Sequence, residues 1–289
     1  MSSAAAAVAV RKRRRGLLRT WPARIALVGV VGIVGLSAVG PFLTPYSPSE
    51  LAGIPFDTPG GEFRLGTDYL GEDVFSRVLA GGWRLILLAG LATVIAYVLG
   101  TAVGLLAGYS RTLADPILMR SMDLLLAFPP ILLLLLLAAG FGGNVVIIVV
   151  GIVLVQLPLV ARVVRTATLE ASVRGYVEAS AARGDPTWSI LGREILPNIW
   201  APISADAGPR FTISILLVAA LNFLGLGVAP PTPDWAVMIS ENRSGITLNP
   251  WALGVPAALI AILTVSVNTL ADALTRSLGH STDVDTLRR

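Results

Sequence analysis

The sequence predicts an all-α integral membrane protein with six transmembrane helices and with both the N- and the C-terminus in the cytoplasm. Hydrophobic residues make up 54% of the 289 residues and charged residues only 14%, well below the roughly 25% that is usual in soluble domains. Uncharged runs long enough to cross a bilayer alternate with short polar segments. Arginines gather in alternate polar segments, which the positive-inside rule places in the cytoplasm.

The first predicted span is the uncharged run at residues 25–43, which follows a basic cytoplasmic tail at residues 1–24. This run has 19 residues, more than the roughly 7–15 of a signal-peptide core, so an uncleaved helix is favoured over a signal peptide. Residues 44–84 then form an extracytoplasmic loop, in which the segment 65–77 is predicted as a turn and a short interfacial helix. Its charges are interpreted as capping and local ion pairing, because the D-x-D-x-D-G pattern of a hard-cation loop is missing.

Residues 85–275 are predicted to form the core, with five more spans. The second span, Leu85–Ser110, carries Gly100, Gly104 and Gly108 at four-residue spacing. Small residues repeated on one face of a membrane helix allow a second helix to approach closely, so this face is interpreted as a packing seam.

The next uncharged run, Leu124–Ala161, has 38 residues, or roughly 57 Å of helix, nearly twice the hydrocarbon thickness. We therefore expect a hairpin of two spans with its outer turn at Gly140–Asn144. Pro129, Pro130 and Pro158 lie within these spans, where prolines mark kinks.

The fifth span is predicted at Phe211–Pro233 and the sixth at Ser244–Ala271, with Trp235 and Trp251 as interfacial anchors between them. Residues 276–289 form a cytoplasmic tail.

The cytoplasmic loop at residues 166–205 contains the most elaborate polar segment, Tyr176–Asn198, which we call the knob. An alanine-rich helix is predicted at Tyr176–Arg183, and Gly184 lies where a glycine closes a helix. Asp185 is then expected to be the N-cap of a second helix.

In that second helix, Pro186 occupies the first position, where its missing N–H costs nothing. One face is predicted to carry the apolar side chains of Trp188, Leu191 and Ile195, and Pro197 is expected to end the helix. The knob is therefore predicted to be a rigid pair of helices, not a flexible linker.

Several kinds of chemistry are excluded by composition. Cysteine is absent, so disulfides, thiolate catalysis and cysteine metal sites are ruled out. The only lysine, Lys12, is not in a phosphate-binding loop, and the only histidine, His280, lies in the tail. Asp206, Arg210 and Asp272 are placed near the cytoplasmic ends of predicted spans, which leaves no ionisable group for ion-driven transport inside them. The net charge of +4 is explained by the positive-inside pattern, so no nucleic-acid partner is expected.

Four motifs resemble the permease subunits of bacterial ABC importers, and in particular the C-type subunits of the dipeptide, oligopeptide and nickel branch. The knob resembles the EAA signature through residues Glu178, Ala179, Ser180, Gly184, Leu196 and Pro197. Segments 65–77, 223–235 and 268–274 resemble three further elements of this branch, in the same order. The sequence departs from the family pattern at four charged or small positions, namely Glu72, Ser180, Glu194 and Arg276.

The resemblance implies a type I ABC importer permease fold in the bacterial inner membrane, in contact with membrane lipid, with the knob as a coupling helix. Contact with the ATPase is expected at Glu178, Ala179, Ser180, Gly184, Asp185, Leu196 and Pro197. The implied partners are a homologous B-type permease, two ABC ATPase domains and an extracytoplasmic solute-binding protein. ATP and Mg would be bound by the ATPases, with no cofactor in this chain, which would not itself be catalytic. The alternatives are an ATP-independent secondary transporter or channel and a structural membrane anchor; the cargo stays open among di- and oligopeptides, nickel, glutathione and haem.

Overall fold

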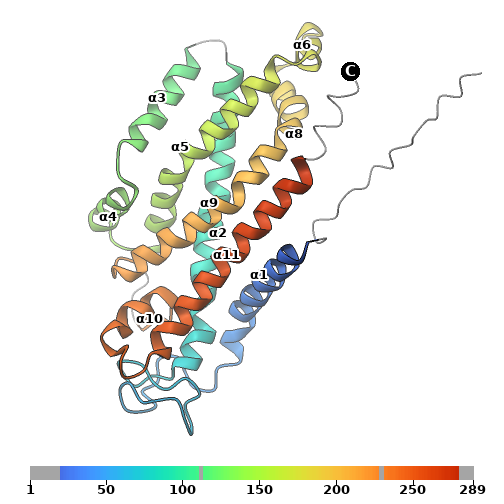
Figure 1. Ribbon diagram of the computed structural model, residues 1–289. Coiled ribbons are helices and arrows are strands. Elements are labelled where there is room, and N and C mark those ends of the chain that lie inside the picture. The colour runs from blue at the N-terminus through green and yellow to red at the C-terminus, as the bar shows by residue number, and fades with distance from the viewer. Residues whose placement is uncertain (1–19, 111–112, 228–230, 280–289) are drawn as a thin grey trace, which may run out of the picture.

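The computed structural model describes residues 20–110, 113–227 and 231–279. The greater part of the basic N-terminal tail, including Lys12, lies outside the described residues, as do Pro230 and the chain from His280 onward. The described chain is helical, with long helices running side by side and short elements at both ends of the bundle (Figure 1).

Five helices of the described chain are long and apolar enough to cross a membrane: α1 (Trp21–Val39, continued by η2, Gly40–Phe42), α2 (Val74–Tyr109), α5 (Val145–Ser172), α9 (Trp200–Phe223) and α11 (Trp251–Gly279). A sixth span is present if α3 (Ala114–Leu126) and α4 (Pro130–Phe141), which are bent by 81° relative to each other, count as one. This arrangement confirms the predicted all-α, multi-pass fold.

The loop at residues 43–73 and the start of α2 form one end of the bundle, which we call the cap. The short interfacial helix predicted there is not separate, because it forms the first turns of α2. Asp73 is the N-cap of α2, and its carboxylate accepts the backbone N–H of Ser76 at 2.9 Å. Because Asp73 caps it, α2 begins at Val74, before the uncharged run that starts at Leu85.

The glycine seam of α2 packs against α5, as the sequence predicted. A Cβ atom placed on Gly100 would lie 2.8 Å from Val160, and one placed on Gly104 would lie 2.6 Å from Val164. At Gly108 the nearest atoms belong to Arg165 and Thr168, at 2.7 Å. The four-residue repeat on α2 therefore meets a four-residue repeat on α5, and each glycine lets a branched side chain approach the α2 backbone.

The turn predicted between the third and fourth spans is present at the expected residues. Gly142 adopts φ +82°, and Asn144 caps α5 by accepting the backbone N–H of Ile147 at 3.0 Å. The third span itself is broken, because α3 ends at Leu126 and α4 begins at Pro130 after the 81° bend. Two consecutive prolines disfavour a helical residue before them, which explains the break.

The fifth and sixth spans lie at different residues from those predicted. Helix α9 begins at Trp200, before the expected start at Phe211, and α11 begins at Trp251, after the expected start at Ser244. A short helix between them, α10 (Trp235–Asn242), is followed by η4 (Arg243–Gly245). The fifth span was predicted to begin only after the charged residues Asp206 and Arg210. These two residues pair with each other, so α9 continues through them.

Trp235 is not the interfacial anchor that the sequence predicted. Its side chain is fully buried against Gly81 and Gly82 of α2, and its indole N–H donates to the carbonyl of Val78 at 2.8 Å. Trp251, by contrast, is 52% exposed, as expected of an anchor. The glycine pair in α2 provides the space for the Trp235 ring, so α10 is fixed on the bundle.

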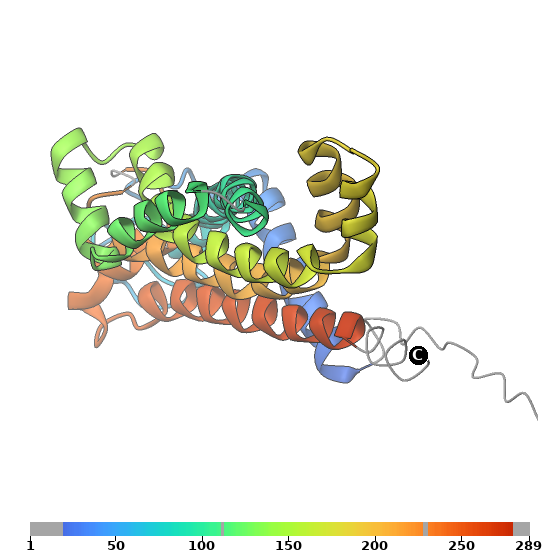
Figure 2. The ribbon, with the colours of Figure 1, turned by 90° about the horizontal axis from the view of Figure 1, so that it is seen from above.

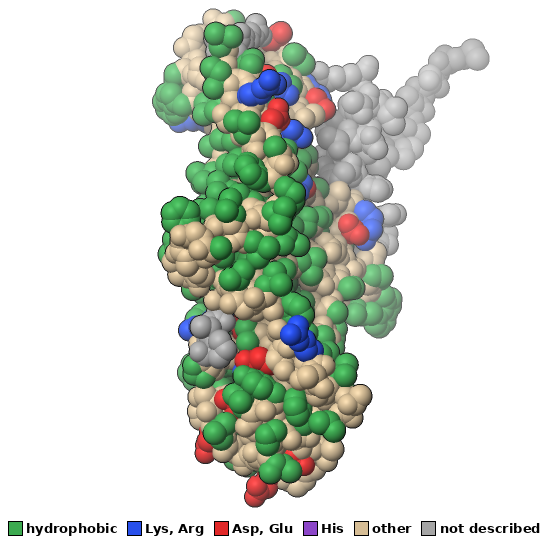
Figure 3. Space-filling view, turned by 90° about the vertical axis from the view of Figure 1, so that its left-hand side faces the viewer, with side chains coloured by type: hydrophobic (Ala, Val, Ile, Leu, Met, Phe, Trp, Pro, Cys, Tyr) green, Lys and Arg blue, Asp and Glu red, His purple; other side chains and the backbone are tan. Residues whose placement is uncertain are grey.

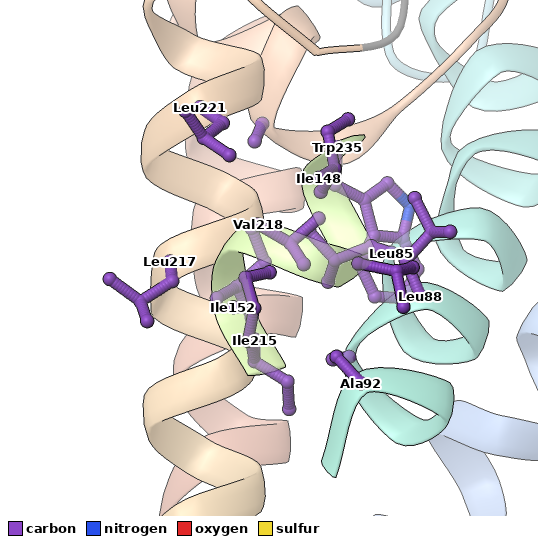
Figure 4. Close-up of a cluster of buried hydrophobic side chains, with 14 of the residues drawn as sticks. Leu85, Leu88, Ala92, Ile148, Ile152, Ile215, Leu217, Val218, Leu221 and Trp235 are labelled. Atoms are coloured by element: carbon purple, nitrogen blue, oxygen red, sulfur yellow. The ribbon is translucent and has the colours of Figure 1, made fainter. Parts of the chain in front are cut away.

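The main core lies where α2, α5 and α9 meet, with Trp235 at its cap end (Figure 4). Its members shown in the close-up include Leu85, Leu88, Ala92, Ile148, Ile152, Ile215, Val218 and Leu221. On the outside, apolar side chains cover the middle of the molecule, while charged side chains gather toward its two ends (Figure 3). This is the surface pattern of a protein that sits in lipid.

Candidate functional site

The knob joins the end of α5 to the start of α9, at the opposite end of the bundle from the cap (Figure 1). It consists of α6 (Gly175–Ala182), a turn, α7 (Thr187–Ser189), the π-helix η3 (Ile190–Ile195) and α8 (Leu196–Asn198). Seen from above, it projects as a compact arm to one side of the long helices (Figure 2). Both helices that enter and leave this arm contribute to the main core.

The turn that closes α6 is built as predicted around Gly184, which has φ +79°. The backbone N–H of Gly184 donates to Ala181 at 3.0 Å, and that of Asp185 donates to Ser180 at 3.2 Å. These two bonds form a Schellman motif, which satisfies carbonyls that the end of the helix would otherwise leave unpaired. A residue with a Cβ would be strained at this φ, so glycine is needed here.

Side chains on either side of Gly184 brace the turn. The Arg183 guanidinium donates to the Ser180 hydroxyl at 2.7 Å and pairs with the Asp185 carboxylate at 2.9 Å. Ser180 is buried, Arg183 is exposed and Asp185 is half-buried. Arg183 is thus held in place by Asp185 and by the hydroxyl of Ser180, the third residue of the segment that resembles the EAA signature.

The second half of the knob differs from the prediction. Asp185 does not cap it, because Pro186 is the N-cap residue and the helix begins at Thr187. The Asp185 carboxylate is instead engaged by Arg183. Pro197 does not end the helix as predicted, because it lies in the first turn of α8, where proline is tolerated, and the chain continues into α9.

The apolar face predicted for this half is only partly correct. Leu191 and Ile195 are buried, but Trp188 is 72% exposed. The i, i+3, i+7 pattern assumed an α-helix, whereas residues from Ile190 onward follow the wider π-helical turn. Because π-helices contain more residues per turn, Trp188 is rotated away from the face that Leu191 and Ile195 share.

A second hydrophobic core holds the knob on the bundle. Val177 from α6 and Ile190, Leu191 and Ile195 from η3 are buried together with residues of α2, α5 and the start of α9, namely Leu105, Val160, Val164, Ala171, Ile199 and Ile203. Sequence analysis missed Val177 and Ile190 as anchors, although each is a β-branched residue that interrupts a small or polar stretch. The knob therefore moves with the helices on which it is mounted.

The seven residues predicted to contact an ATPase fall into two groups. Glu178, Ala179, Gly184 and Pro197 are exposed, whereas Ser180 is buried and Asp185 and Leu196 are half-buried. The exposed members are available to a partner. Ser180 supports the turn from inside and Leu196 packs against the core of the knob, so their contribution to any contact would be indirect.

Beyond the knob, the structure places an ion pair inside a helix that is long enough to span the membrane. Asp206 and Arg210 were expected near the end of a span, but they lie within α9. The Arg210 guanidinium donates to Asp206 at 3.0 Å, and the Tyr97 hydroxyl of α2 donates to the same carboxylate oxygen at 2.8 Å. The pair is neutral overall, which makes these charges tolerable in a membrane-spanning helix.

A polar layer continues from this pair into the bundle. The Gln156 amide of α5 donates to the Arg210 carbonyl at 2.7 Å and to the Ser214 hydroxyl at 3.0 Å. Thr93 of α2 in turn donates to Ser214 at 2.8 Å. Three helices are thus joined by hydrogen bonds in a region where water is scarce and where unsatisfied polar groups are costly.

Comparison with known proteins identifies the chain. Residues 100–283 match the family model described as "binding-protein-dependent transport system inner membrane component". The di/tripeptide transport system permease protein DppC of Pseudomonas aeruginosa is 39% identical over 85% of this chain and 84% of its own length. The glutathione transport system permease protein GsiD of Pectobacterium atrosepticum is 36% identical over 91% of this chain and 88% of its own length.

The fold is also similar to that of a chain from the MetNI methionine ABC transporter, solved in inward-facing conformations. The match has a TM-score of 0.56 and 19% sequence identity, and it covers 68% of this chain and 93% of that one. The family match and the fold agree with the location of the apolar helices. The chain therefore belongs to the family of inner membrane components of binding-protein-dependent transport systems, as a multi-pass permease.

Proposed function

We propose that this chain is the C-type permease subunit of an ATP-driven importer of di- or oligopeptides. The names of its relatives support a peptide cargo, since the di/tripeptide permease and the dipeptide permeases of Alkalihalophilus pseudofirmus and Haemophilus influenzae all match most of the chain. In this proposal a homologous B-type permease completes the pathway, and an extracytoplasmic binding protein delivers the peptide. Two ABC ATPase domains bind ATP and Mg, while this chain itself is not a catalyst.

The main support for this proposal is the way in which the knob is attached to the bundle. A short arm with an exposed outer face is fixed by a buried core to α2, α5 and α9, which also form the main core of the bundle. A force applied to such an arm is transmitted as rigid-body motion, since packed interfaces shift between discrete arrangements instead of deforming continuously. We infer that the ATPase holds the exposed Glu178, Ala179, Gly184 and Pro197, with Ser180, Asp185 and Leu196 shaping that surface from within.

The experiment is a comparison of two knob variants with one control in the assembled transporter. Glu178→Arg reverses an exposed charge, and Gly184→Val strains the turn. Glu170→Gln, on the exposed side of α5 outside the knob, is the control. Both knob variants are expected to lose co-purification of the ATPase and ATP-dependent peptide uptake, while the control keeps both. Unchanged coupling in both knob variants would refute the assignment of the knob.

A second measurement separates this function from transport without ATP. The purified chain alone, reconstituted in liposomes with a peptide or ion gradient, is expected to take up no peptide. Gradient-driven uptake by the chain alone would instead favour a secondary transporter or a channel, with the pair Asp206 and Arg210 as its first candidate site.

A further inference from the structure

At the cap, one buried arginine is surrounded by three carboxylates. Arg77, in the first turns of α2, contacts Asp68 and Glu72 through the same guanidinium nitrogen, Nη1. Its Nη2 pairs with Glu241 of α10 at 3.0 Å. The side chains of Arg77, Asp68 and Glu72 are at most 4% exposed, and that of Glu241 is 12% exposed. If all three acids were ionised, the cluster would hold an excess of two negative charges away from water.

Burying uncompensated charge is expensive, so the cluster needs a neutralising species. A metal ion does not fit, since the described residues contain no group of three or more His, Cys, Asp or Glu side chains arranged to hold one. A proton fits, because the Glu72 and Asp68 carboxyl groups both lie against the same nitrogen of Arg77, where two ionised carboxylates would repel each other. A proton on one of them removes this repulsion.

The surrounding bonds indicate which acid carries that proton. Asp68 Oδ1 accepts the backbone N–H groups of Leu70 and Glu72, both at 2.9 Å, while its other oxygen contacts Arg77. Both carboxylate oxygens of Asp68 are therefore already engaged by donors. No backbone donor to the Glu72 carboxylate is seen in the described chain, so Glu72 is the better place for the proton.

We propose that Glu72 holds a proton that keeps the cap loop clasped to α10, and that loss of this proton on the alkaline side releases the clasp. The contacts involved join segments that are far apart in sequence. Tyr69 donates its backbone N–H to Asn242 at 3.0 Å and its hydroxyl to Glu241 at 3.2 Å. Ionised Glu72 would repel Glu241, the least buried acid of the cluster, and so separate α10 from the loop.

The electrostatics of the cluster agree with this geometry. Burial raises the pKa of Glu72 to about 7, with Asp68 and Glu241 raising it further and Arg77 opposing the shift. Burial likewise raises the pKa of Glu241, in part against Arg77 and Tyr69, and raises that of the Tyr69 hydroxyl to about 12. The charged neighbours that act on Glu72 thus come from three elements: Asp68 from the loop, Arg77 from α2 and Glu241 from α10. With the knob in the cytoplasm, the clasp faces the outside, where pH is not controlled by the cell.

The sign of the pH effect follows from the direction of the shift. The closed form of Glu72 has a pKa of about 7 against an ordinary value of 4.5, so the closed cap binds the proton more tightly than the open cap does. The stabilisation is therefore complete below about pH 4.5 and is lost as the pH rises toward 7. Between pH 5 and 8.5 the opening equilibrium should rise by roughly 10- to 100-fold.

The test is amide hydrogen exchange of the full-length chain in lipid nanodiscs at pH values from 5 to 8.5, corrected for intrinsic exchange. The probe peptides cover residues 65–77 and 235–242, and the middle of α5 serves as an internal reference. Wild type is expected to lose at least tenfold protection in both probe peptides as the pH rises, while Glu72→Gln stays protected throughout. Glu62→Gln, an exposed acid of the same loop, should behave as wild type.

A second variant keeps the proposal testable if Glu72→Gln fails to fold. Glu241→Gln removes one negative neighbour and keeps an oxygen for the Tyr69 hydroxyl, so the midpoint of the transition should move to lower pH. Protection in wild type that does not change with pH would overturn the proposal. So would the same pH dependence in wild type and Glu72→Gln, loss of the transition in Glu62→Gln, or an unmoved midpoint in Glu241→Gln.

Discussion

Replacing one glycine of the seam between α2 and α5 should separate the two helices that hold the bundle together. In Gly104→Ala, the new methyl group would lie 2.6 Å from the Val164 Cβ and 2.7 Å from the Ala161 carbonyl oxygen. Neither atom can rotate away, because one is the branch point of a β-branched side chain and the other is backbone. The helices must therefore move apart, which weakens the neighbouring contacts at Gly100 and Gly108.

The expected loss of stability can be worked out by comparing Gly104 with a glycine of the same helix that has room for a methyl group. Overpacking a close-packed interface costs about 1–3 kcal/mol, whereas alanine is about 1 kcal/mol better than glycine in a helix interior. A Cβ added to Gly90 of α2 would have its nearest neighbour, Phe211, at 3.8 Å, so Gly90→Ala should gain only the second effect. The two variants should differ in unfolding free energy by about 1–3 kcal/mol, with Gly104→Ala the less stable.

Thermal or denaturant unfolding in nanodiscs measures this difference. The chain contains no cysteine and six tryptophans, so intrinsic fluorescence is the suitable signal and thiol-reactive dyes are not. Gly35→Ala in α1, where no atom lies within 4 Å of the added methyl group, controls for a general effect of alanine in the membrane. If Gly104→Ala proved as stable as Gly90→Ala, the seam would not be a close-packed contact and the reasoning would fail.

Three further predictions concern the cap, α10 and the knob. Arg77→Leu leaves three carboxylates without their cation and should cost about 3–5 kcal/mol, seen as a loss of folded protein on size-exclusion chromatography; a normal yield would contradict it. Trp235→Ala empties the space beside Gly81 and Gly82 and should cost about 3–5 kcal/mol in thermal unfolding, whereas Trp235→Phe should cost clearly less. Gly184→Ala places a Cβ at φ +79° and should cost about 1–2 kcal/mol locally, so that peptide uptake falls while the unfolding of the bundle stays near wild type.

Much of the fold could be predicted because the relevant signals are local. Uncharged runs located the first, second and fourth spans, and the spacing of Gly100, Gly104 and Gly108 predicted a contact that the structure confirms. Gly184 was predicted as the end of a helix from its position alone, and it has the positive φ that this role requires. In each of these cases the physical cause lies within a few residues of the signal.

Features that depend on contacts distant in sequence could not be predicted in this way. Local pairing among residues 68–77 was expected, but the partner Glu241 belongs to a helix that the sequence did not reveal. Trp235 carried the composition of an interfacial anchor, yet its burial depends on Gly81 and Gly82 in another helix. The roles assigned to the residues of the knob remain predictions, since contact with an ATPase leaves no trace in one chain.

The course of α9 through Asp206 and Arg210 determines how the knob acts on the bundle. A charge-free window excluded Asp206 and Arg210, but their mutual pairing and the Tyr97 hydroxyl make them compatible with the interior of α9. Because α9 extends through this point without interruption, it connects the knob directly to the polar layer around Gln156, which also holds α5. The two helices that carry the knob are therefore fastened to each other halfway along the bundle as well as at its end. A displacement of the knob must then move α5 and α9 together, and with them α2, unless these hydrogen bonds break in a medium that offers no replacement for them.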